Sequence, residues 1–270
     1  MLVVGIAGII RLFLKGWFPV TLKRILLCAP LLAPMPAGAE ISGFVEANAL
    51  HTLLHELGHA VISEFELPVL GQEEDAVDAF ATSEIIQMMP EDAEAILTDV
   101  ALSWLIMDAR TDRADLDFFD EHDLDAQRGY RTICHLYGAD PEAHKDAADW
   151  VEIPEDIREN CEAAGAQAMD SWNAMLEGGA LREEGAAKQT IAISYGPTAQ
   201  FPALRADAMA AELLEWASDY AAENFAWPAP LEIEARECGE VNAYWDPGAR
   251  RITLCYEILA EWAELEQEAE

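Results

Sequence analysis

The spacing of apolar residues along the chain predicts a mainly helical protein. In seven segments apolar residues recur every three or four positions, which is the period of a helix with one buried face. Proline or acidic residues stand at the first turn of several segments, and both favour a helix N-terminus. The predicted helices are residues 43–65, one beginning at Glu73, one beginning at Pro90, residues 123–136, 155–176 and about 203–226, and one after Cys255.

Three segments have the alternating pattern of strands. They are residues 189–195, residues 231–235 and a hairpin over residues 241–256 that turns at Asp246-Pro247-Gly248-Ala249. Proline and glycine between two alternating runs are typical of such a turn. The pattern therefore predicts a single α+β domain over residues 40–270, mainly helical, with a small antiparallel sheet or hairpin.

The first 39 residues differ from the rest, because they contain four basic residues and no acidic one. The basic pair Lys23-Arg24 precedes an apolar run over residues 25–32 and then Ala37-Gly38-Ala39, which is the pattern of a secretory signal peptide cleaved near Ala39. The apolar run is too short and too interrupted by proline for a stable membrane span. We therefore expect residues 1–39 to be a signal peptide and the mature protein to be periplasmic or secreted.

Residues 1–20 are a second hydrophobic stretch ahead of that signal, and they leave the true start codon open. Either the signal peptide is unusually long, or the assigned start lies too far upstream and Val20 is the initiator position. An uncleaved N-terminal membrane anchor is the alternative to export as a free protein.

The chain is strongly acidic, with 51 acidic and 16 basic residues and a formal net charge of −35. Cleavage near Ala39 would remove four basic residues and no acidic one, which takes the charge from −35 to −39. A chain of this charge does not bind nucleic acid or anionic lipid through its overall field. Nucleic acid is therefore excluded as an expected partner.

Four cysteines remain after the predicted cleavage site, and an even number in an exported protein predicts disulfides. Three pairings are possible. The pairing in chain order, Cys134–Cys161 and Cys238–Cys255, is preferred because each pair brackets its own structural unit.

The segment His55-Glu56-Leu57-Gly58-His59 carries the clearest chemistry in the chain. On a helix, residues four apart leave the same face, so His55 and His59 can share one metal ion. Glu56 stands beside the first histidine, where it can act as a general base towards a zinc-activated water. The simpler explanation is two histidines on a partly buried helix face. The pattern favours a site for one zinc ion.

A catalytic zinc site needs a third protein ligand. Glu74 lies fifteen residues after His59, at the start of the next predicted helix, where one sharp turn would return it to the histidines. Asp78 is one helical turn further and suits a role behind a ligand, accepting the free imidazole N–H. The expected ligands are His55, His59 and Glu74, with Glu73 and Asp78 as competitors for the third place.

The oxyanion that forms when water attacks a carbonyl needs a further positive or hydrogen-bonding partner. The sequence offers four candidates without geometry to choose among them, and each has an ordinary structural role as its alternative. They are His122, Tyr244, Tyr256 and Arg131.

The motif followed by Glu74-x-x-x-Asp78-x-Phe80-Ala81 resembles the gluzincin peptidases. The chain is also similar to a bacterial envelope family of metallopeptidases whose activity is itself a prediction. The similarity extends to segments 67–75, 122–138, 238–243 and 255–257. It implies a zincin-like fold with an active-site helix and a neighbouring glutamate helix, His55, His59 and Glu74 as ligands, and Glu56 as base. It implies no particular substrate.

Together these features predict an exported zinc-dependent metallopeptidase that hydrolyses peptide or protein substrates. Two alternatives remain open. One is a non-catalytic, zinc-containing binding module of the envelope, in which a fourth protein ligand closes the metal site. The other is a zinc amidase acting on a non-peptide or cell-wall amide, which ligand spacing cannot separate from a peptidase because the attacking group is the same.

Overall fold

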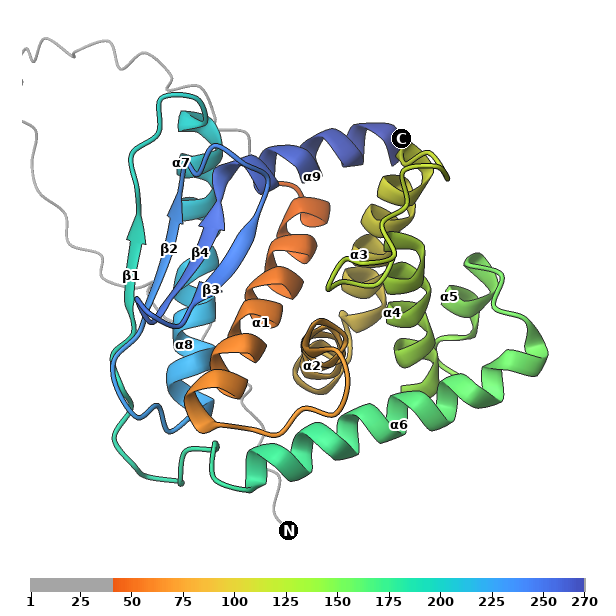
Figure 1. Cartoon of the computed structure of the whole chain (residues 1–270), viewed down its shortest axis with the longest axis horizontal. Helices are drawn as coiled ribbons and strands as arrows, with labels where there is room; N and C mark the ends of the chain where they lie inside the picture. Colours follow the sequence, from red (N-terminus) through yellow and green to blue (C-terminus); the bar gives the residue numbers. More distant parts are fainter. Residues whose placement is uncertain (1–40, 270) are drawn as a thin grey trace, which may run out of the picture. The chain divides into compact units, whose positions relative to one another are not determined.

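A long helix, α1 (Gly43–Phe65), lies at the centre of the structure, a computed structural model that describes residues 41–269. Ser42 caps its start by accepting a hydrogen bond from the N–H of Val45 at 3.3 Å. Glu66, in the left-handed conformation, ends the helix just before Leu67-Pro68. Most of α1 is buried, because a sheet covers one side of it and other helices cover the opposite side (Figure 1).

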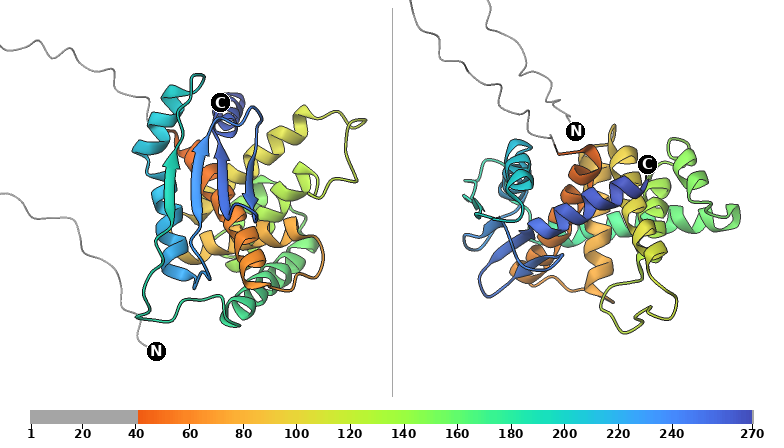
Figure 2. Two further views of the ribbon diagram at one scale, coloured as in Figure 1. Left: turned by 60° about the vertical axis from the view of Figure 1, so that its left-hand side comes forward. Right: turned by 90° about the horizontal axis from the view of Figure 1, so that it is seen from above.

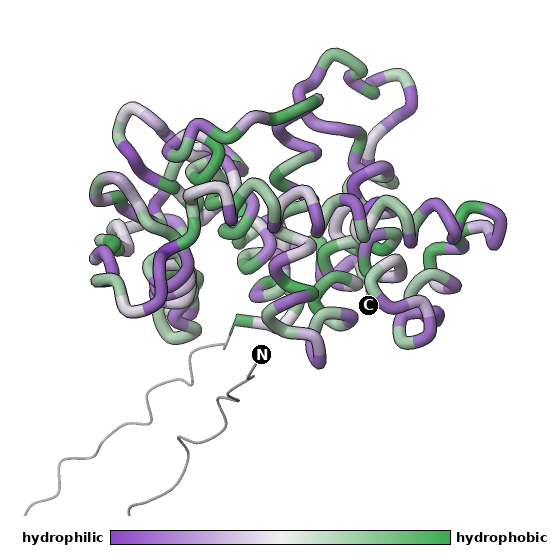
Figure 3. Tube along the Cα trace, turned by 90° about the horizontal axis from the view of Figure 1, so that it is seen from below, coloured by the Kyte–Doolittle hydropathy of each residue, from purple (hydrophilic) through white to green (hydrophobic). Residues whose placement is uncertain are grey.

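The predicted signal peptide, residues 1–39, lies outside the described residues. Among residues 41–269, no helix combines the length and the apolar character needed to cross a membrane. The described residues belong to one compact unit. Hydrophobic and hydrophilic residues alternate along its helices and strands, as Figure 3 shows along the chain trace.

Helices α2 to α6 follow α1 and build the helical side of the molecule. Helices α2 and α3 contact α1 directly, α4 packs against α3 and α2, and α6 crosses α4 (Figure 1). Their bounds are α2 (Glu73–Met88), α3 (Ala93–Arg110), α4 (Asp125–Ala139), α5 (Lys145–Trp150) and α6 (Glu155–Glu177). The sequence predicts four of these helices. The fifth, α5, has only six residues, too few for its apolar period to be recognised.

The prediction of a single helix at about 203–226 is wrong, because the structure has two helices there. They are α7 (Pro202–Ala210) and α8 (Leu213–Asn224), and the break falls at Glu212, which has a φ of 53°. The hydroxyl of Tyr195 accepts the N–H of Leu214 at 3.0 Å, so the interrupted helix regains a partner at its new start. Helix α9 (Tyr256–Ala269) ends the described chain.

Four short strands form one mixed sheet in the order β1-β2-β4-β3. Strands β3 (Ala243–Asp246) and β4 (Arg251–Cys255) form the predicted antiparallel hairpin. Strands β1 (Ala192–Tyr195) and β2 (Glu232–Arg236) extend it by two parallel pairings, β1 with β2 and β2 with β4. Helices α7 and α8 carry the chain back between β1 and β2, and strand β3 carries it back between β2 and β4. Strand β3 is an edge of the sheet and lies against α1 (Figure 2). The α+β class is therefore confirmed, but the expectation of an antiparallel sheet is wrong, because two of the three strand pairings are parallel.

The disulfides follow the chain-order pairing, Cys134–Cys161 and Cys238–Cys255. The first links α4 to α6, with Cα atoms 4.9 Å apart. Gly138 lies one turn beyond Cys134, and a Cβ there would overlap the carbonyl group of Cys161. A glycine and a covalent bond together hold α6 tightly against α4.

A buried histidine on α4 should make stability depend on pH. Burial, aided by Arg131, lowers the pKa of His135 to about 4, whereas an unfolded chain has a value near 6.5. Between these values the unfolded chain takes up a proton that the folded chain does not, so stability falls as the pH drops from 6.5 to 4. The loss is about 3 kcal/mol at most, at about 1.4 kcal/mol per pKa unit.

Denaturant unfolding of wild type and His135→Gln at several pH values across this window measures the effect. The variant should lose less stability than wild type as the pH falls. Parallel stability curves for the two proteins would contradict this origin of the pH dependence.

Candidate metal centre

Three polar side chains of the predicted motif project from one stretch of α1. His55 and Glu56 are buried, each with 6% of its surface exposed, and His59 is partly exposed. The rings of His55 and His59 have centroids 4.9 Å apart, as expected for residues one helical turn apart. Their Nε2 atoms are 3.2 Å apart. The two imidazoles therefore point at one place.

Glu74 reaches the same place from the first turn of α2. Its Oε2 atom lies 3.1 Å from Nε2 of His55 and 3.3 Å from Nε2 of His59. Gly58 permits this approach, because a Cβ at that position would lie 2.9 Å from Val77 Cγ1. A side chain larger than hydrogen on α1 would thus push α2 away.

A carboxylate holds the second nitrogen of each histidine. Nδ1 of His55 donates to Asp78 at 2.7 Å, and Nδ1 of His59 donates to Glu73 at 2.8 Å. Such bonds fix the tautomer of each ring and leave the Nε2 lone pair for another partner. The two competitors of Glu74 for the third ligand place thus lie behind the histidines.

The donor chemistry fits a divalent cation. With both Nδ1 atoms bound to carboxylates, the two Nε2 atoms and an oxygen of Glu74 converge at one point, and they form a set of nitrogen and oxygen ligands that suits zinc. Zinc with bonds of about 2.0–2.1 Å holds the ligand atoms of a tetrahedron about 3.3–3.4 Å apart. The separations among His55, His59 and Glu74 are 3.1–3.3 Å. These three residues can hold the ion.

The charges around Glu74 keep it in its ligand form. Burial alone would raise the pKa of its carboxyl group, but hydrogen bonds from His122, His55 and His59 hold that pKa well below its usual range. For His59 the effects are reversed. Burial alone would lower the pKa of its imidazole, but hydrogen bonds with Glu74 and Glu73 outweigh burial and raise that pKa to about 9. Glu74 is therefore a carboxylate at neutral pH.

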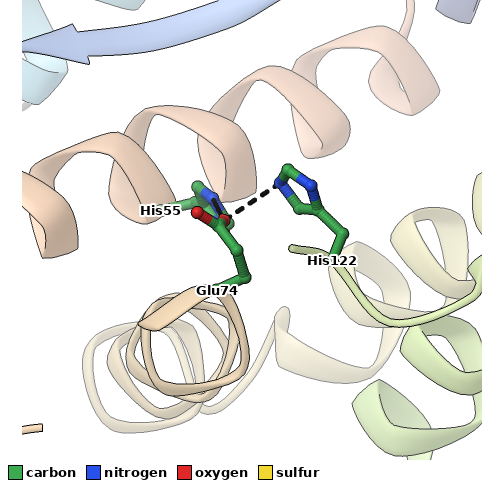
Figure 4. A group of neighbouring side chains, drawn as sticks. All are labelled: His55, Glu74 and His122. Atoms are coloured by element: carbon green, nitrogen blue, oxygen red, sulfur yellow. Dashed lines mark hydrogen bonds and ion pairs between the residues drawn. The ribbon is translucent and has the colours of Figure 1, made fainter. Parts of the chain in front are cut away.

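His122 is a fourth possible metal ligand beside His55, His59 and Glu74, and it comes from the loop between α3 and α4. Figure 4 shows its ring facing Glu74 and His55. Its Nε2 atom lies 3.0 Å from Oε2 of Glu74, and its Nδ1 atom lies 3.0 Å from Asp120. The ring stacks near that of His55 at a centroid distance of 6.3 Å. His55, Glu74 and His122 thus form a group whose ligand atoms all lie within 4.8 Å of one another.

Arg128 on α4 supports the site through Asp78. Its Nε and one terminal nitrogen bind the two carboxylate oxygens of Asp78 at 2.7 and 2.8 Å. Its guanidinium carbon lies 3.7 Å from the centre of the Trp104 ring, a cation–π contact that fixes its plane. Trp104, Arg128, Asp78 and His55 therefore form a continuous chain of contacts ending at a candidate ligand.

Removing this support should weaken metal binding without unfolding the protein. We expect Arg128→Met to lower zinc affinity by about 10–100-fold, the effect usual for partners behind a ligand. Arg128→Lys should fall in the same range, because lysine cannot bind a carboxylate in two places. Competition against a chromogenic zinc chelator measures the affinity.

Arg131→Met is the matched control on the same helix. Arg131 pairs with Asp75 and Asp123 at 2.7 and 2.6 Å and does not bind Asp78. It should retain wild-type zinc affinity. An Arg128→Met protein that binds zinc as tightly as Arg131→Met would show that Arg128 has no role in positioning His55.

Glu56 occupies the wall of a pocket of about 220 Å³ beside the donor group. Burial raises the pKa of its carboxyl group, and the charges of His55 and His59, with a smaller contribution from the backbone N–H of Trp245 on β3, partly offset the increase. A raised pKa suits a group that must take up and release a proton near neutral pH. The predicted base thus lies between the two histidines of α1 and the edge strand.

Of the four candidates for the oxyanion partner, the structure brings only His122 to the donor group. The Tyr244 hydroxyl pairs with Arg236, and the buried Tyr256 hydroxyl donates to the carbonyl of Gly196 at 2.9 Å. Arg131 is engaged by its two acidic partners. The sequence analysis did not identify Arg128 as a residue of the site. The only signal was its position within residues 122–138, one of the segments that carry the family resemblance.

An α+β domain in which two neighbouring helices bring two histidines and a carboxylate to one point has the architecture of a metal-dependent hydrolase. The chain matches the sequence profile of a family described as "Putative metallopeptidase" over residues 38–176 and 198–270. It belongs to this family. Comparison with curated proteins and with solved structures gave no match. The family indicates peptidase activity.

Proposed function

We propose that the protein is an exported zinc-dependent metallopeptidase in which His55, His59 and Glu74 hold one zinc ion. The observation that carries the proposal is the convergence of their three donor atoms within 3.3 Å, with both outer imidazole nitrogens bound to carboxylates. Asp78 and Glu73 orient the two rings, and Arg128 orients Asp78.

Glu56 is the proposed general base. When bound, zinc supplies a Lewis acid that polarises a carbonyl group and lowers the pKa of a water molecule. The Glu56 carboxylate, held by the N–H of Trp245, accepts the proton of the attacking water and returns it to the leaving amine. Burial at 6% exposure excludes bulk water from competing for this proton.

His122 is the proposed partner of the oxygen that becomes negative. Carboxylates face both of its nitrogens, at 3.0 Å each, and their hydrogen bonds raise the pKa of its imidazole. If a metal ion takes the oxygen of Glu74 that now faces Nε2 of His122, the N–H at that nitrogen becomes free to donate to an oxyanion next to the metal position.

The position of strand β3 favours a peptide as the substrate. The strand is a sheet edge beside α1, and its first residue, Ala243, lines the same pocket as Glu56. An extended peptide can add to such an edge through main-chain hydrogen bonds. The base and the proposed peptide-binding edge are then joined by a single backbone hydrogen bond.

Export is supported by two observations. The pattern of residues 1–39 predicts a signal peptide, and the described chain has two disulfides, which form in oxidising compartments. Expression with residues 1–39 fused to a reporter that is active only outside the cytoplasm tests this part. A reporter that stays inactive would refute export through this segment.

The central experiment combines metal analysis with a peptide-library digest of purified mature protein. We expect about one zinc ion per chain and cleavage that stops on chelation and returns with added zinc. Stoichiometric zinc without cleavage of any peptide would reject the peptidase and favour a second function.

That second candidate is a non-catalytic envelope module, and His122 is the observation that favours it. As a fourth protein ligand, His122 would close the site to water and substrate. X-ray absorption of the zinc-loaded protein counts two imidazoles in the peptidase and three in the closed module. His122→Ala should retain zinc and lose about 10²–10³-fold in turnover in the first case, but lose much of its zinc affinity in the second.

A further inference from the structure

The lining of the pocket beside Glu56 is mixed, with polar side chains mainly from α1 and apolar side chains mainly from α3 and α9. The pocket lies between α1, α3, the segment before β3, and α9, and His55 and Glu56 form part of its lining. Its apolar walls come from α3 and α9. They are Val100, Trp104, Met107, Ile258 and Trp262.

Glu56 and His122 belong to the proposed reacting end of the pocket, and the two other charged residues of its lining, Arg128 and Glu261, are already engaged. The Arg128 guanidinium binds Asp78 through two nitrogens and stacks on Trp104. Glu261 pairs with Arg110. Neither charge is free to bind a substrate side chain of opposite sign.

The buried polar groups at its floor also have partners. The Asn48 side chain accepts from the Ser103 hydroxyl at 2.7 Å and donates to the carbonyl of Phe44 at 2.9 Å. His51 Nε2 lies 3.3 Å from the Thr82 hydroxyl. A polar substrate group entering here would lose its water and find few partners, which is unfavourable.

The volume of the pocket limits the size of the ligand that it can hold. A volume of about 220 Å³ lies below the range of about 300–1,000 Å³ typical of sites for drug-sized ligands. The pocket therefore suits one side chain of a longer molecule rather than a whole ligand.

We propose that this pocket binds one bulky apolar side chain of a peptide substrate, directly beside the bond that is cleaved. The substrates are then peptide segments with a residue such as phenylalanine, leucine or methionine adjacent to the scissile bond. This inference rests on the proposed function, since it takes His55 and Glu56 as the reacting end of the pocket.

Binding of amino-acid hydroxamates to the zinc-loaded protein tests the pocket without requiring turnover. The hydroxamate group anchors each probe at the metal, and the side chain alone differs between glycine hydroxamate and phenylalanine hydroxamate. Calorimetry should show at least about tenfold tighter binding of the phenylalanine probe, as expected for filling an apolar pocket. Equal or undetectable binding of the two probes would overturn the proposal.

Substitutions on α3 provide matched variants. Met107→Trp fills the pocket and should reduce binding of the phenylalanine probe at least about tenfold, while glycine hydroxamate keeps its affinity and reports an intact metal site. Met107→Ala widens the pocket and should improve binding of tryptophan hydroxamate, so the test survives if the larger residue prevents folding. Equal losses for both probes in Met107→Trp, or no effect of either variant, would overturn the proposal.

Ile96→Trp is the control on the same helix. Ile96 lines a separate cavity of about 420 Å³ that includes neither His55 nor Glu56. This variant should bind both hydroxamates as wild type does, and a selective loss of the phenylalanine probe would assign the preference to the wrong cavity.

The library digest separates this inference from the proposed function. Selective hydroxamate binding with no cleavage of any peptide would reject the peptidase function but support the proposal that the pocket binds an apolar side chain. Cleavage with no preference for an apolar residue on either side of the scissile bond would keep the peptidase and reject the pocket.

Discussion

Glu56→Gln should bind one zinc ion as wild type does and lose about 10²–10⁴-fold in peptide hydrolysis. The glutamine keeps the shape of the side chain and can still meet the N–H of Trp245 through its oxygen, but it cannot accept a proton at neutral pH. Glu56 contributes no atom to the triangle of donors formed by His55, His59 and Glu74, so metal content should not change. Steady-state turnover and metal analysis on one preparation give both numbers.

Glu46→Gln is the control for this experiment. Glu46 stands on the same helix in an exposed position, so the same chemical change there should leave both metal content and turnover intact. Wild-type turnover in Glu56→Gln would remove Glu56 from the mechanism. Loss of zinc in Glu56→Gln would instead make it a ligand and redefine the site.

Alanine substitutions of two adjacent glutamates of α2, Glu73 and Glu74, should have very different effects on zinc binding. Glu74→Ala removes one of three proposed ligands, and we expect zinc binding to fall below detection at micromolar metal, with all hydrolysis lost. Glu73→Ala removes only the partner of His59 Nδ1, and we expect about a 10–100-fold loss of affinity. Exposure supports this order, because the Glu73 side chain is 47% exposed and that of Glu74 is 14% exposed.

Both variants lose one negative charge from the first turn of α2, so any general effect on that helix N-terminus is shared. Equilibrium dialysis against buffered zinc, with thermal unfolding of the metal-free proteins as a check of folding, measures the difference. Similar affinities for the two variants would contradict Glu74 as the third ligand, and a greater loss for Glu73→Ala would assign that place to Glu73.

The local parts of the structure could be predicted because they depend on spacing along one element. Helix α1 follows from its apolar period and from Leu67-Pro68, and the common face of His55 and His59 follows from a separation of four residues. The β3–β4 hairpin follows from its turn residues. The α+β class needs only these local patterns.

The remainder depends on contacts between distant segments. The parallel pairings of β1, β2 and β4 and the break at Glu212 arise from how the chain returns across the sheet, which no local period encodes. His122 stands out from Tyr244, Tyr256 and Arg131 only because a loop carries it to Glu74. Arg128 acquires its place through Asp78, fifty residues earlier in the chain.

Gly58 has a consequence for anyone who would redesign this protein. It is the least helix-favouring residue at the centre of α1, and replacing glycine by alanine inside a helix ordinarily gains about 1 kcal/mol. Automated stabilisation would therefore choose position 58 early. The added methyl group would meet Val77 and Phe80 and move Glu74 away from the two histidines, so a choice made on helix propensity alone would damage both the packing of α1 on α2 and the metal site.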